Sequence, residues 1–496
     1  MLHGGRLGNV RDNVIHFTSS RKDDIRLAEA VLAINKAHVA MVMEQNIIQW
    51  QTGTKILAAL AALSASTLDP NAEDVHMAVE EAVLAQIGPE VGGNIHVAKS
   101  RNDQVTTAIR MTLRNDLLFI MQEILEMQQN LLDTAAKHLH TIILEYTHLQ
   151  AAQPVTYAHY LVSQHDVLER DLQRLQGTYK RVNLSPLGAG ALATTSFPLN
   201  RKRTSELLGF DDVLENSIDA VGSRDFIIET IATLTLTAVN LSRFAEDLII
   251  WSSAEFGTVE LPDEFTSTSS IMPQKKNPEC LEVIRARASY ALGDYVAAAA
   301  AIKSLPTAYN LDFQEITPKL WDATDNLKAS LNIFAQLIPY IKVSSNVEEK
   351  AAAGFVGATE LANMLVRKYG VAFRTAHKIV GALVKSLIES KQTLLDVTSQ
   401  MLQKAAKDNA NLELNVKLED IIECTNPRKI VENYKVQGGP SPAKVEIALK
   451  ERLKSHVESE KAVLSLKTAL SNTSNTLDAL IDLYSSQSLD NINQNR

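Results

Sequence analysis

The segment 266–282, TSTSSIMPQKKNPECLE, holds two adjacent serines, two lysines and an asparagine within nine residues. A serine hydroxyl can remove a proton from a substrate only where the local field lowers its pKa, and Lys275 and Lys276 could supply that field. Lysine and amide donors also suit a substrate carboxylate or a developing negative charge. The alternative is a solvated surface loop with ordinary charges, and composition alone does not decide between the two.

Two further polar segments carry groups suited to acid–base chemistry or anion binding. His148 lies among hydrogen-bonding residues in YTHLQ at 146–150 and could act as an acid or a base, although a lone histidine is more often structural. Arg101 in KSRND at 99–103 offers a bidentate fork for a carboxylate or phosphate. A helix N-terminus at Arg101 would add backbone donors. The alternative there is a capping segment with a surface arginine.

The sequence gives little support to a metal or nucleotide site. His138 and His140 form an HxH pair, but no cysteine or carboxylate spacing supports metal binding beside them. The glycines of GAG at 188–190 do not form a phosphate loop, because both GxGxxG and GxxxxGK[ST] are absent. We therefore expect no cofactor and no metal.

Long helices must position these loops, because helix-breaking residues are scarce. The 496 residues include 20 glycines and 14 prolines, below the usual shares of roughly 7% and 5%. Neither residue occurs between Gly222 and Gly257, where apolar residues recur at alternating steps of four and three. They are Ile227, Ile231, Leu234, Ala238, Leu241, Ala245 and Leu248. This heptad stripe predicts a helix in a bundle rather than a free coiled coil.

Two prolines mark the expected starts of further helices. Pro154 suits the first turn of a helix running toward Gly177, and Pro278 suits the first turn of one running toward Pro306. A composition shift near residue 350 suggests a domain boundary. We predict an all-α protein of three mostly helical domains. They are an N-terminal helical domain (1–100), a central long-helix bundle domain (101–352) and a C-terminal helical domain (353–496).

Charge and cysteine content restrict the class of protein. The net charge of −9, from 49 basic and 58 acidic residues, gives no electrostatic reason to expect a nucleic-acid partner. Two cysteines, Cys280 and Cys424, cannot make a disulfide framework, which fits a reducing compartment. The first residues lack the apolar core of a signal peptide, and no apolar run reaches about 18 residues. We therefore expect a cytoplasmic protein without a membrane partner.

The loops occur with further motifs in an order that resembles the fumarase/aspartase superfamily of lyases, and in detail its argininosuccinate lyase branch. SSIMPQKKNP at 269–278 looks like the signature loop, in which QKKN replaces the GKVN of fumarases and aspartases and the HKxN of adenylosuccinate lyases. The resemblance covers essentially the whole chain and weakens after about residue 390. The other matching motifs are LHGGRLG (2–8), EDVH (73–76), KSRNDQV (99–105), THLQAAQP (147–154), PLGAGALA (186–193), NSIDAVGSRDF (216–226), SRFAEDL (242–248) and PTAYNLDFQE (306–315).

The resemblance implies a reaction and an assembly. The reaction is the reversible anti β-elimination of argininosuccinate to arginine and fumarate in arginine biosynthesis, without a cofactor. A base removes the proton next to a succinyl carboxylate, negative charge spreads into that carboxylate, and an acid protonates the departing guanidinium nitrogen. The implied fold has three mostly helical domains, whose long central helices form the twenty-helix core of a homotetramer. Each active site is then drawn from three subunits.

The family motifs also imply roles for individual residues. Ser269 matches the catalytic base on a mobile loop, His148 matches its acid partner, and Glu282 matches the carboxylate that orients this histidine. Lys275 and Asn277 match the residues that hold the carboxylate taking up charge. The remaining matches are Arg101, Asn102 and Thr147 for the fumarate portion, with Tyr309, Gln314 and Arg243 near the substrate.

Some positions depart from the family pattern. Thr268 replaces the glycine that usually opens the signature loop, and Asn35 stands where a serine contacts the substrate. Leu311 and Thr317 fall where many members carry lysine. These changes concern the arginine end of the substrate more than the elimination. A related lyase acting on another succinyl-amine, or a non-catalytic scaffold of the lens-crystallin kind, are the alternative functions.

Overall fold

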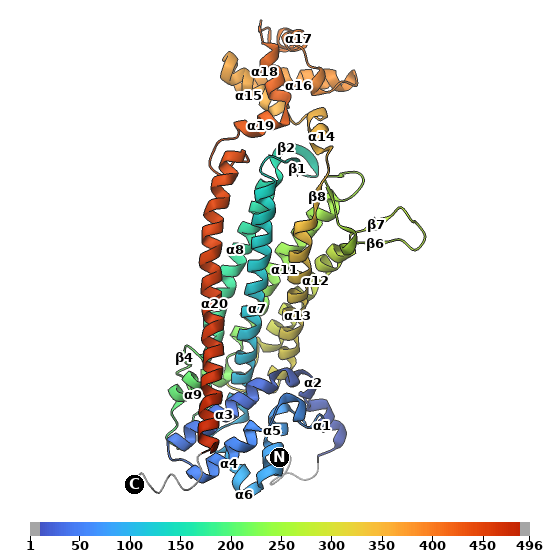
Figure 1. Cartoon of the computed structure of the whole chain (residues 1–496). Helices are drawn as coiled ribbons and strands as arrows, with labels where there is room; N and C mark the ends of the chain where they lie inside the picture. Colours follow the sequence, from blue (N-terminus) through green and yellow to red (C-terminus); the bar gives the residue numbers. More distant parts are fainter. Residues whose placement is uncertain (1–9, 487–496) are drawn as a thin grey trace.

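The computed structural model describes residues 10–486. Figure 1 shows an elongated molecule in which long helices run lengthwise between two groups of shorter helices. The all-α class expected from the sequence is confirmed, because the strands are short and form only two-stranded pairings within these residues. The LHGGRLG motif at 2–8 lies outside the described residues. No helix among those described is both long and apolar enough to span a bilayer.

Short helices form the N-terminal end of the molecule. They are α1 (Asp12–Thr18), α2 (Arg21–Asp24), α3 (Ala28–Glu44), α4 (Trp50–Ala61), α5 (Val75–Ile87) and α6 (Pro89–Gly92), with 3-10 turns at Ile25–Leu27, Ala65–Thr67 and Gly93–His96. Helix α3 is buried along most of its length and packs on α4, α5 and α7 (Arg101–Lys137). In contrast, α1 buries none of its residues.

The central region holds most of the long helices and the four strand pairs found within residues 10–486. Its helices are α7, α8 (Tyr157–Val182), α9 (Arg201–Leu207), α10 (Ser217–Gly222), α11 (Asp225–Trp251), α12 (Glu279–Ile302) and α13 (Phe313–Leu337), with 3-10 turns at Asp263–Phe265 and Ile338–Tyr340. The antiparallel pairs are β1 (Ile142–Thr147) with β2 (Gln150–Thr156), β5 (Val259–Glu260) with β8 (Lys342–Val343), and β6 (Ser267–Thr268) with β7 (Lys276–Asn277). The parallel pair is β3 (Leu184–Ser185) with β4 (Asp212–Val213).

The heptad stripe forms the buried face of α11, as the sequence predicts. All seven residues of the stripe are buried in the main apolar core. Helix α11 packs against α8, α12 and α13, so the long helices form a bundle rather than a free coiled coil. The predicted helix after Pro278 is also present as α12, with Pro278 at its N-cap.

The expected position of Pro154 is wrong. Pro154 lies in strand β2, paired opposite Leu144, and α8 begins three residues later at Tyr157. The side chain of Thr156 caps α8 by accepting a hydrogen bond from the amide of His159 at 3.1 Å. The side chain of Thr156, two residues after the proline, therefore fixes the helix start. Pro154 itself lies in a two-stranded hairpin, where its strand pairs with only one neighbour.

The C-terminal part consists of a group of shorter helices and one long helix, α20. Its elements are α14 (Val347–Ala353), α15 (Ala358–Tyr369), α16 (Phe373–Glu389), α17 (Ser399–Ala410), α18 (Leu418–Thr425), α19 (Pro427–Asn433) and α20 (Pro442–Ser486), with a 3-10 turn at Leu394–Asp396. Residues between 361 and 424 form a separate small apolar core. Helix α20 instead returns along the bundle and packs on α7, α4 and α8 (Figure 1). The three predicted domain ranges remain a prediction.

Candidate active site

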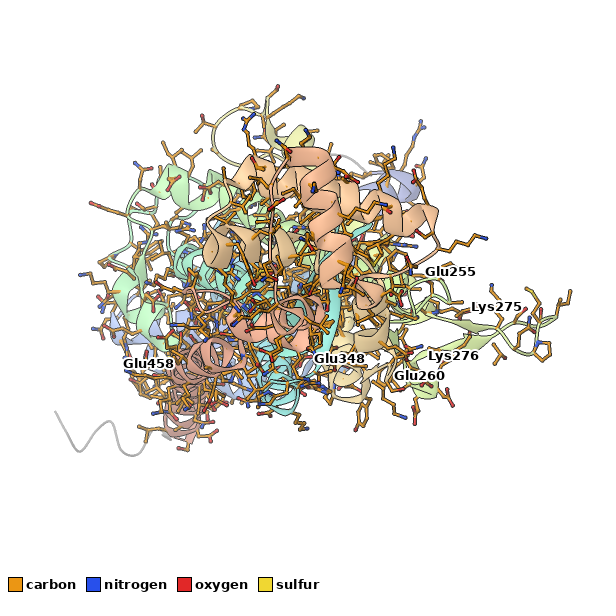
Figure 2. The ribbon with its side chains drawn as sticks, turned by 90° about the horizontal axis from the view of Figure 1, so that it is seen from above. Glu255, Glu260, Lys275, Lys276, Glu348 and Glu458 are labelled. Atoms are coloured by element: carbon orange, nitrogen blue, oxygen red, sulfur yellow. The ribbon has the colours of Figure 1, made fainter. Side chains whose placement is uncertain are left out.

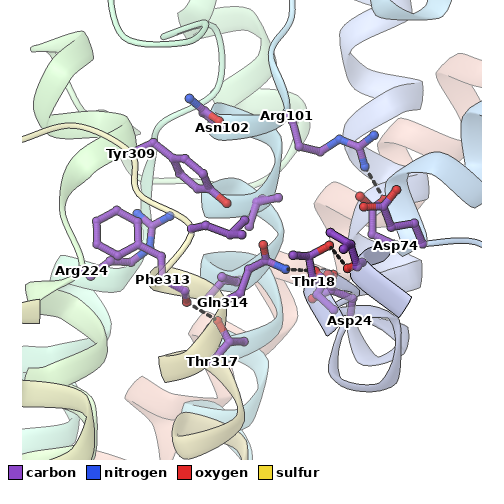
Figure 3. A pocket seen from close by; sticks show the side chains of 16 residues that line it. Thr18, Asp24, Asp74, Arg101, Asn102, Arg224, Tyr309, Phe313, Gln314 and Thr317 are labelled. Carbon is purple, nitrogen blue, oxygen red and sulfur yellow. Dashed lines mark hydrogen bonds and ion pairs between the residues drawn. The ribbon is translucent and has the colours of Figure 1, made fainter. Parts of the chain in front are cut away.

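A cavity of about 400 Å³ opens at the N-terminal end of the bundle. Its walls come from α1, α2, the first turns of α7 and the segment 309–317, with Arg224 at one side (Figure 3). Three carboxylates, Asp24, Glu73 and Asp74, and two guanidinium groups, Arg101 and Arg224, line it. A ligand with charged groups of both signs would therefore find complementary partners in this cavity.

Arg101 is the first residue of α7, as the sequence predicts. Ser100 caps the helix in a reciprocal capping box with Asp103. One guanidinium nitrogen of Arg101 forms an ion pair with Asp74 (Figure 3), which itself caps α5 by accepting a hydrogen bond from the Met77 amide at 2.7 Å. Two helix N-termini are thus joined at the cavity wall by one ion pair.

Asp24 supplies a buried carboxylate beside this ion pair. Its side chain accepts a hydrogen bond from the hydroxyl of Ser20. Burial raises the pKa of Asp24 to about 7, the Ser20 hydrogen bond opposes the rise, and the nearby Asp74 carboxylate adds to it. A cationic ligand group would favour the charged form of Asp24.

Arg224 lies on the opposite wall and is only 2% exposed. Its Nη1 donates hydrogen bonds to the carbonyls of Val221 at 3.1 Å and Ser223 at 2.8 Å, and its guanidinium lies 4.3 Å from the centre of the Phe313 ring. Burial lowers the pKa of Arg224 to about 9. Tyr309 packs edge-on against Phe313 with ring centres 5.7 Å apart, and burial raises the pKa of its phenol.

Gln314 and Thr317 complete the floor of the cavity on the first turns of α13. The Gln314 side chain donates a hydrogen bond to the Thr18 carbonyl at 3.4 Å, which joins α13 to the end of α1 (Figure 3). The Thr317 hydroxyl donates to the Phe313 carbonyl of its own helix at 3.2 Å. The structure therefore brings Arg101, Asn102, Tyr309 and Gln314, four of the sequence-predicted residues, to one place.

His148 lies far from this cavity within the same chain. It forms the turn between β1 and β2 together with Leu149, and both residues have positive φ, 56° and 55°, as a tight two-residue hairpin turn requires. Thr147 and His148 are exposed. Helix α7 runs 37 residues from Arg101 toward this hairpin, a length of about 55 Å at 1.5 Å per residue. Figure 1 shows the hairpin at the opposite end of the bundle from α1 and α2.

The signature segment forms a hairpin that projects from the body. Strands β6 and β7 are its stem, and Lys275 lies in the projecting loop (Figure 2). The Ser269 hydroxyl accepts hydrogen bonds from the amides of Ile271 and Met272 at 3.3 and 3.1 Å. Asn277 donates a hydrogen bond to the Ser267 hydroxyl at 3.4 Å, and Lys276 pairs with Asp263 at 2.6 Å. Ser269, Lys275 and Asn277 thus share one element, whose loop is exposed.

Comparison with known proteins identifies the family of this chain. A family model described as "Lyase" matches residues 5–293, and one described as "Argininosuccinate lyase C-terminal" matches residues 355–432. The chain is 42% identical over 468 residues to the argininosuccinate lyase of Methanococcus maripaludis strain C6, covering 92% of this chain and 96% of the relative. It is 44% identical to that of Methanothermobacter thermautotrophicus, covering 93% and 99%. The chain belongs to the argininosuccinate lyase family.

Solved structures agree with this membership. A crystal structure of EDDS lyase in complex with formate matches with a TM-score of 0.87 and 31% identity, covering 93% of this chain and 92% of that one. A fumarate lyase from Mesorhizobium sp. BNC1 matches with a TM-score of 0.69 at 19% identity, covering 88% and 98%, and shows the shared fold. These two lyases therefore share the fold of this chain.

Three sequence-predicted residues of this family member lie outside the cavity and both hairpins. Glu282 is exposed on the first turn of α12. Arg243 lines a different cavity with Asp247. Asn35 is buried in α3, where it accepts a hydrogen bond from Lys99 at 2.5 Å and donates one to the Val31 carbonyl at 2.8 Å. In this chain Asn35 thus packs behind the Arg101 turn rather than in the cavity.

The sequence reasoning missed several cavity residues. Ser20 and Asp24 line the cavity, whereas Asn35, which was expected to contact the substrate, does not. Their signal was the polar run SSRKDD at 19–24, placed directly before a long apolar helix. Asp74 and Arg224 lie inside the motifs EDVH and NSIDAVGSRDF, which carried no assigned role. The ion pair with Arg101 places Asp74 at the cavity, and the packing of α10 against α7 places Arg224 there.

Proposed function

We propose that this chain catalyses the reversible anti β-elimination of argininosuccinate to L-arginine and fumarate, a step of arginine biosynthesis. The observation that carries the proposal is identity of 42–44% to curated argininosuccinate lyases over more than nine-tenths of the chain. The chain also retains Ser269, His148 and Lys275, which makes a non-catalytic scaffold the weaker alternative. The mixed-charge cavity adds support, because arginine carries both cationic groups and a carboxylate.

In the proposed mechanism, Ser269 removes the proton next to the succinyl carboxylate. Lys275 and Asn277 lie in the same hairpin, so they can follow Ser269 onto the substrate and hold the carboxylate that takes up negative charge. His148, oriented by Glu282, protonates the departing guanidinium nitrogen. Arg101, Asn102 and Thr147 bind the fumarate portion, while Tyr309 and Gln314 contact the substrate from the cavity wall. No metal or cofactor takes part in this proposal.

The mechanism requires several copies of the chain, and we propose a homotetramer with shared active sites. Ser269, His148 and Arg101 occupy three separate elements, and about 55 Å of helix separates the ends that carry Arg101 and His148. Helices α11 and α12 also expose apolar residues that a partner bundle could cover. These residues are Leu236, Val239, Val283, Tyr290, Leu292 and Val296.

We also propose a cytoplasmic location, and a small-molecule substrate as the partner of the homotetramer, with no nucleic acid and no membrane. Cys280 and Cys424 are both free thiols in the structure, as a reducing compartment would keep them. The acidic net charge of −9 speaks against nucleic acid.

A related lyase acting on another succinyl-amine is the second candidate. EDDS lyase is 31% identical to this chain over 93% of its length. The exposed Leu311 and buried Thr317 line the cavity at two positions where many argininosuccinate lyases carry lysine. These two positions bear on the amine end of the substrate, so they affect which amine leaves more than the elimination itself.

A fumarate-release assay at matched concentrations distinguishes the two candidates. The purified chain is incubated with argininosuccinate or with other succinyl-amines, and fumarate is measured directly. We expect argininosuccinate to give the highest kcat/KM. If argininosuccinate gives no fumarate while another succinyl-amine does, the proposed substrate is wrong and the second candidate is correct.

A further inference from the structure

Asp103, in the first turn of α7, is fully buried and accepts hydrogen bonds from three backbone amides. Its Oδ1 accepts from Ser100 at 3.1 Å, and its Oδ2 accepts from Gly188 at 3.0 Å and from Gly190 at 2.8 Å. Burying a carboxylate is costly unless such donors surround it, and hydrogen bonds to a charged acceptor are stronger than neutral ones. Asp103 thus ties the turn 188–190 to the start of α7.

This turn has a backbone that only glycine adopts without strain. Gly188 and Gly190 have φ of 83° and 62°. A Cβ on Gly190 would lie 2.6 Å from the Thr194 carbonyl oxygen, so a side chain does not fit there. The amide of Thr194 in turn donates a hydrogen bond to the Ala189 carbonyl at 2.8 Å. The turn therefore holds one rigid shape, and Asp103 fixes where that shape lies.

The loop that follows this turn is hydrogen-bonded to Asn102, a residue that lines the cavity. The carbonyl of Ala191, directly after Gly190, accepts a hydrogen bond from the Asn102 side chain at 3.1 Å. The next carbonyl, that of Leu192, accepts one from the Ser217 hydroxyl of α10 at 2.8 Å. Consecutive residues of α7, Asn102 and Asp103, therefore bind the same loop, but only Asn102 lines the cavity.

The far end of α10 also contacts the cavity wall. A Cβ on Gly222 would lie 2.9 Å from Cα of Ala308, the residue before Tyr309. Arg224 follows Gly222 by two residues. The loop that Asp103 holds therefore contacts α10, and the end of α10 contacts the segment that carries Tyr309. A shift of the loop would therefore change the positions of Asn102, Arg224 and Tyr309 together.

We propose that Asp103 is a positioning residue for the lyase reaction, and that its carboxylate, by clamping the turn 188–190, holds Asn102 in its substrate-binding orientation. The proposal rests on the proposed function. Asp103 does not line the cavity, so it acts through Asn102 and the loop rather than on the substrate.

The charges around Asp103 make the clamp sensitive to acid. Burial raises its pKa to about 6, while the three amides and the nearby Lys99 lower it. Lys99 is itself buried with its pKa lowered to about 7, and Arg201 faces the carboxylate from α9. Protonation below pH about 6 places a hydroxyl where an amide N–H now donates, so the clamp weakens as pH falls through this value.

Asp103→Asn in the full-length enzyme tests the proposal. The amide group is nearly isosteric, but its NH₂ must face at least one backbone donor. We expect kcat for argininosuccinate cleavage to fall about 100-fold, the loss that a misplacement of about 1 Å can cause. We also expect the decrease of kcat/KM below about pH 6 to be absent from the pH profile of the variant. Asp171→Asn is the matched control, since Asp171 in the middle of α8 is also fully buried and accepts hydrogen bonds from Asn240 of α11 and from Arg174. It should keep kcat within about threefold of wild type.

Gly190→Ala breaks the same clamp from the loop side and leaves the carboxylate intact. It should lose kcat by a similar factor, and the double variant should lose little more than either single one, because both changes remove one contact. Wild-type kcat in folded Asp103→Asn, an equal loss in Asp171→Asn, or additive losses in the double variant would each overturn the proposal. Failure of the wild-type chain to release fumarate from argininosuccinate would instead refute the proposed function.

Discussion

At the scale of single residues, the cavity holds two buried ionisable groups, and burial shifts the pKa of each in the direction that favours its neutral form. Burial raises the pKa of Asp24 to about 7 and lowers that of Arg224 to about 9. A bound zwitterionic amino acid would present a cation to the first and a carboxylate to the second. The amine product of the proposed reaction would thus meet complementary charges at Asp24 and Arg224, in the same cavity where Arg101 and Asn102 bind the fumarate portion in the proposed mechanism.

Asp24→Asn should remove a pH dependence of stability. The pKa of Asp24 is raised to about 7 from an ordinary 3.8, so between these values the folded chain keeps a proton that the unfolded chain has released. The stability from this group is therefore lost as pH rises through about 7. In thermal melts without ligand, Tm of the variant minus Tm of wild type should increase from pH 5 to pH 8. A constant difference over this range would contradict the buried carboxylate.

Ser269→Ala should reduce kcat at least 100-fold, roughly the lower contribution of a general base, while the oligomeric state stays unchanged. The neighbouring Ser270→Ala is the matched control, because both serines lie in the same hairpin loop. Steady-state kinetics with argininosuccinate and sedimentation of both variants make the comparison. Near-normal turnover in Ser269→Ala would refute its role as the base.

Residue types in short motifs were predictable from the sequence, but their neighbours were not. Arg101 at a helix N-terminus follows from the capping sequence around Ser100. Asn35 was expected at the substrate, yet it lies buried against Lys99 because α3 turns that face inward. The cavity instead uses Ser20 and Asp24. Their position depends on how the turn Ile25–Leu27, directly after α2, packs against α7, which no local sequence pattern predicts.

At the scale of elements, apolar periodicity predicted α11 well because one buried stripe repeats through the whole helix. Its seven stripe residues all lie in the core. The prediction that Pro154 begins a helix was wrong, because a proline can open a helix or lie in a hairpin strand. In this chain the pairing of β1 with β2 holds Pro154 in a strand. Helix α11 also exposes Leu236 and Val239 on its other face. The heptad stripe did not predict these exposed apolar residues.

Leu236→Asp should break the proposed oligomer. Leu236 is 49% exposed on α11, and a carboxylate buried there by a partner bundle would lack a counter-charge. Sedimentation should show smaller species, and activity should fall with the loss of assembly. Leu464→Asp on α20 is the control, since Leu464 is 59% exposed there and should leave both properties unchanged. A Leu236→Asp variant that still sediments as a tetramer would place the interface elsewhere.

At the scale of the whole molecule, the proposed catalytic groups are carried on three separate elements. The cavity with Arg101 lies at one end of the bundle, the His148 hairpin lies at the other, and the Ser269 hairpin projects from the side (Figures 1 and 2). A rigid bundle about 55 Å long cannot fold these groups together. The elongated shape therefore makes sense if each active site is completed by neighbouring copies.

Complementation between two inactive variants tests this central claim most directly. Arg101→Ala and His148→Ala are each purified, mixed in equal amounts, dissociated and reassembled, and argininosuccinate cleavage is measured. If the two residues reach a site from different copies, mixed tetramers contain some sites with both residues intact, and about a quarter of wild-type activity should return. If both residues came from one chain, every site would lack one of them. Activity that stays at the level of the separate variants after confirmed mixing would contradict the composite site.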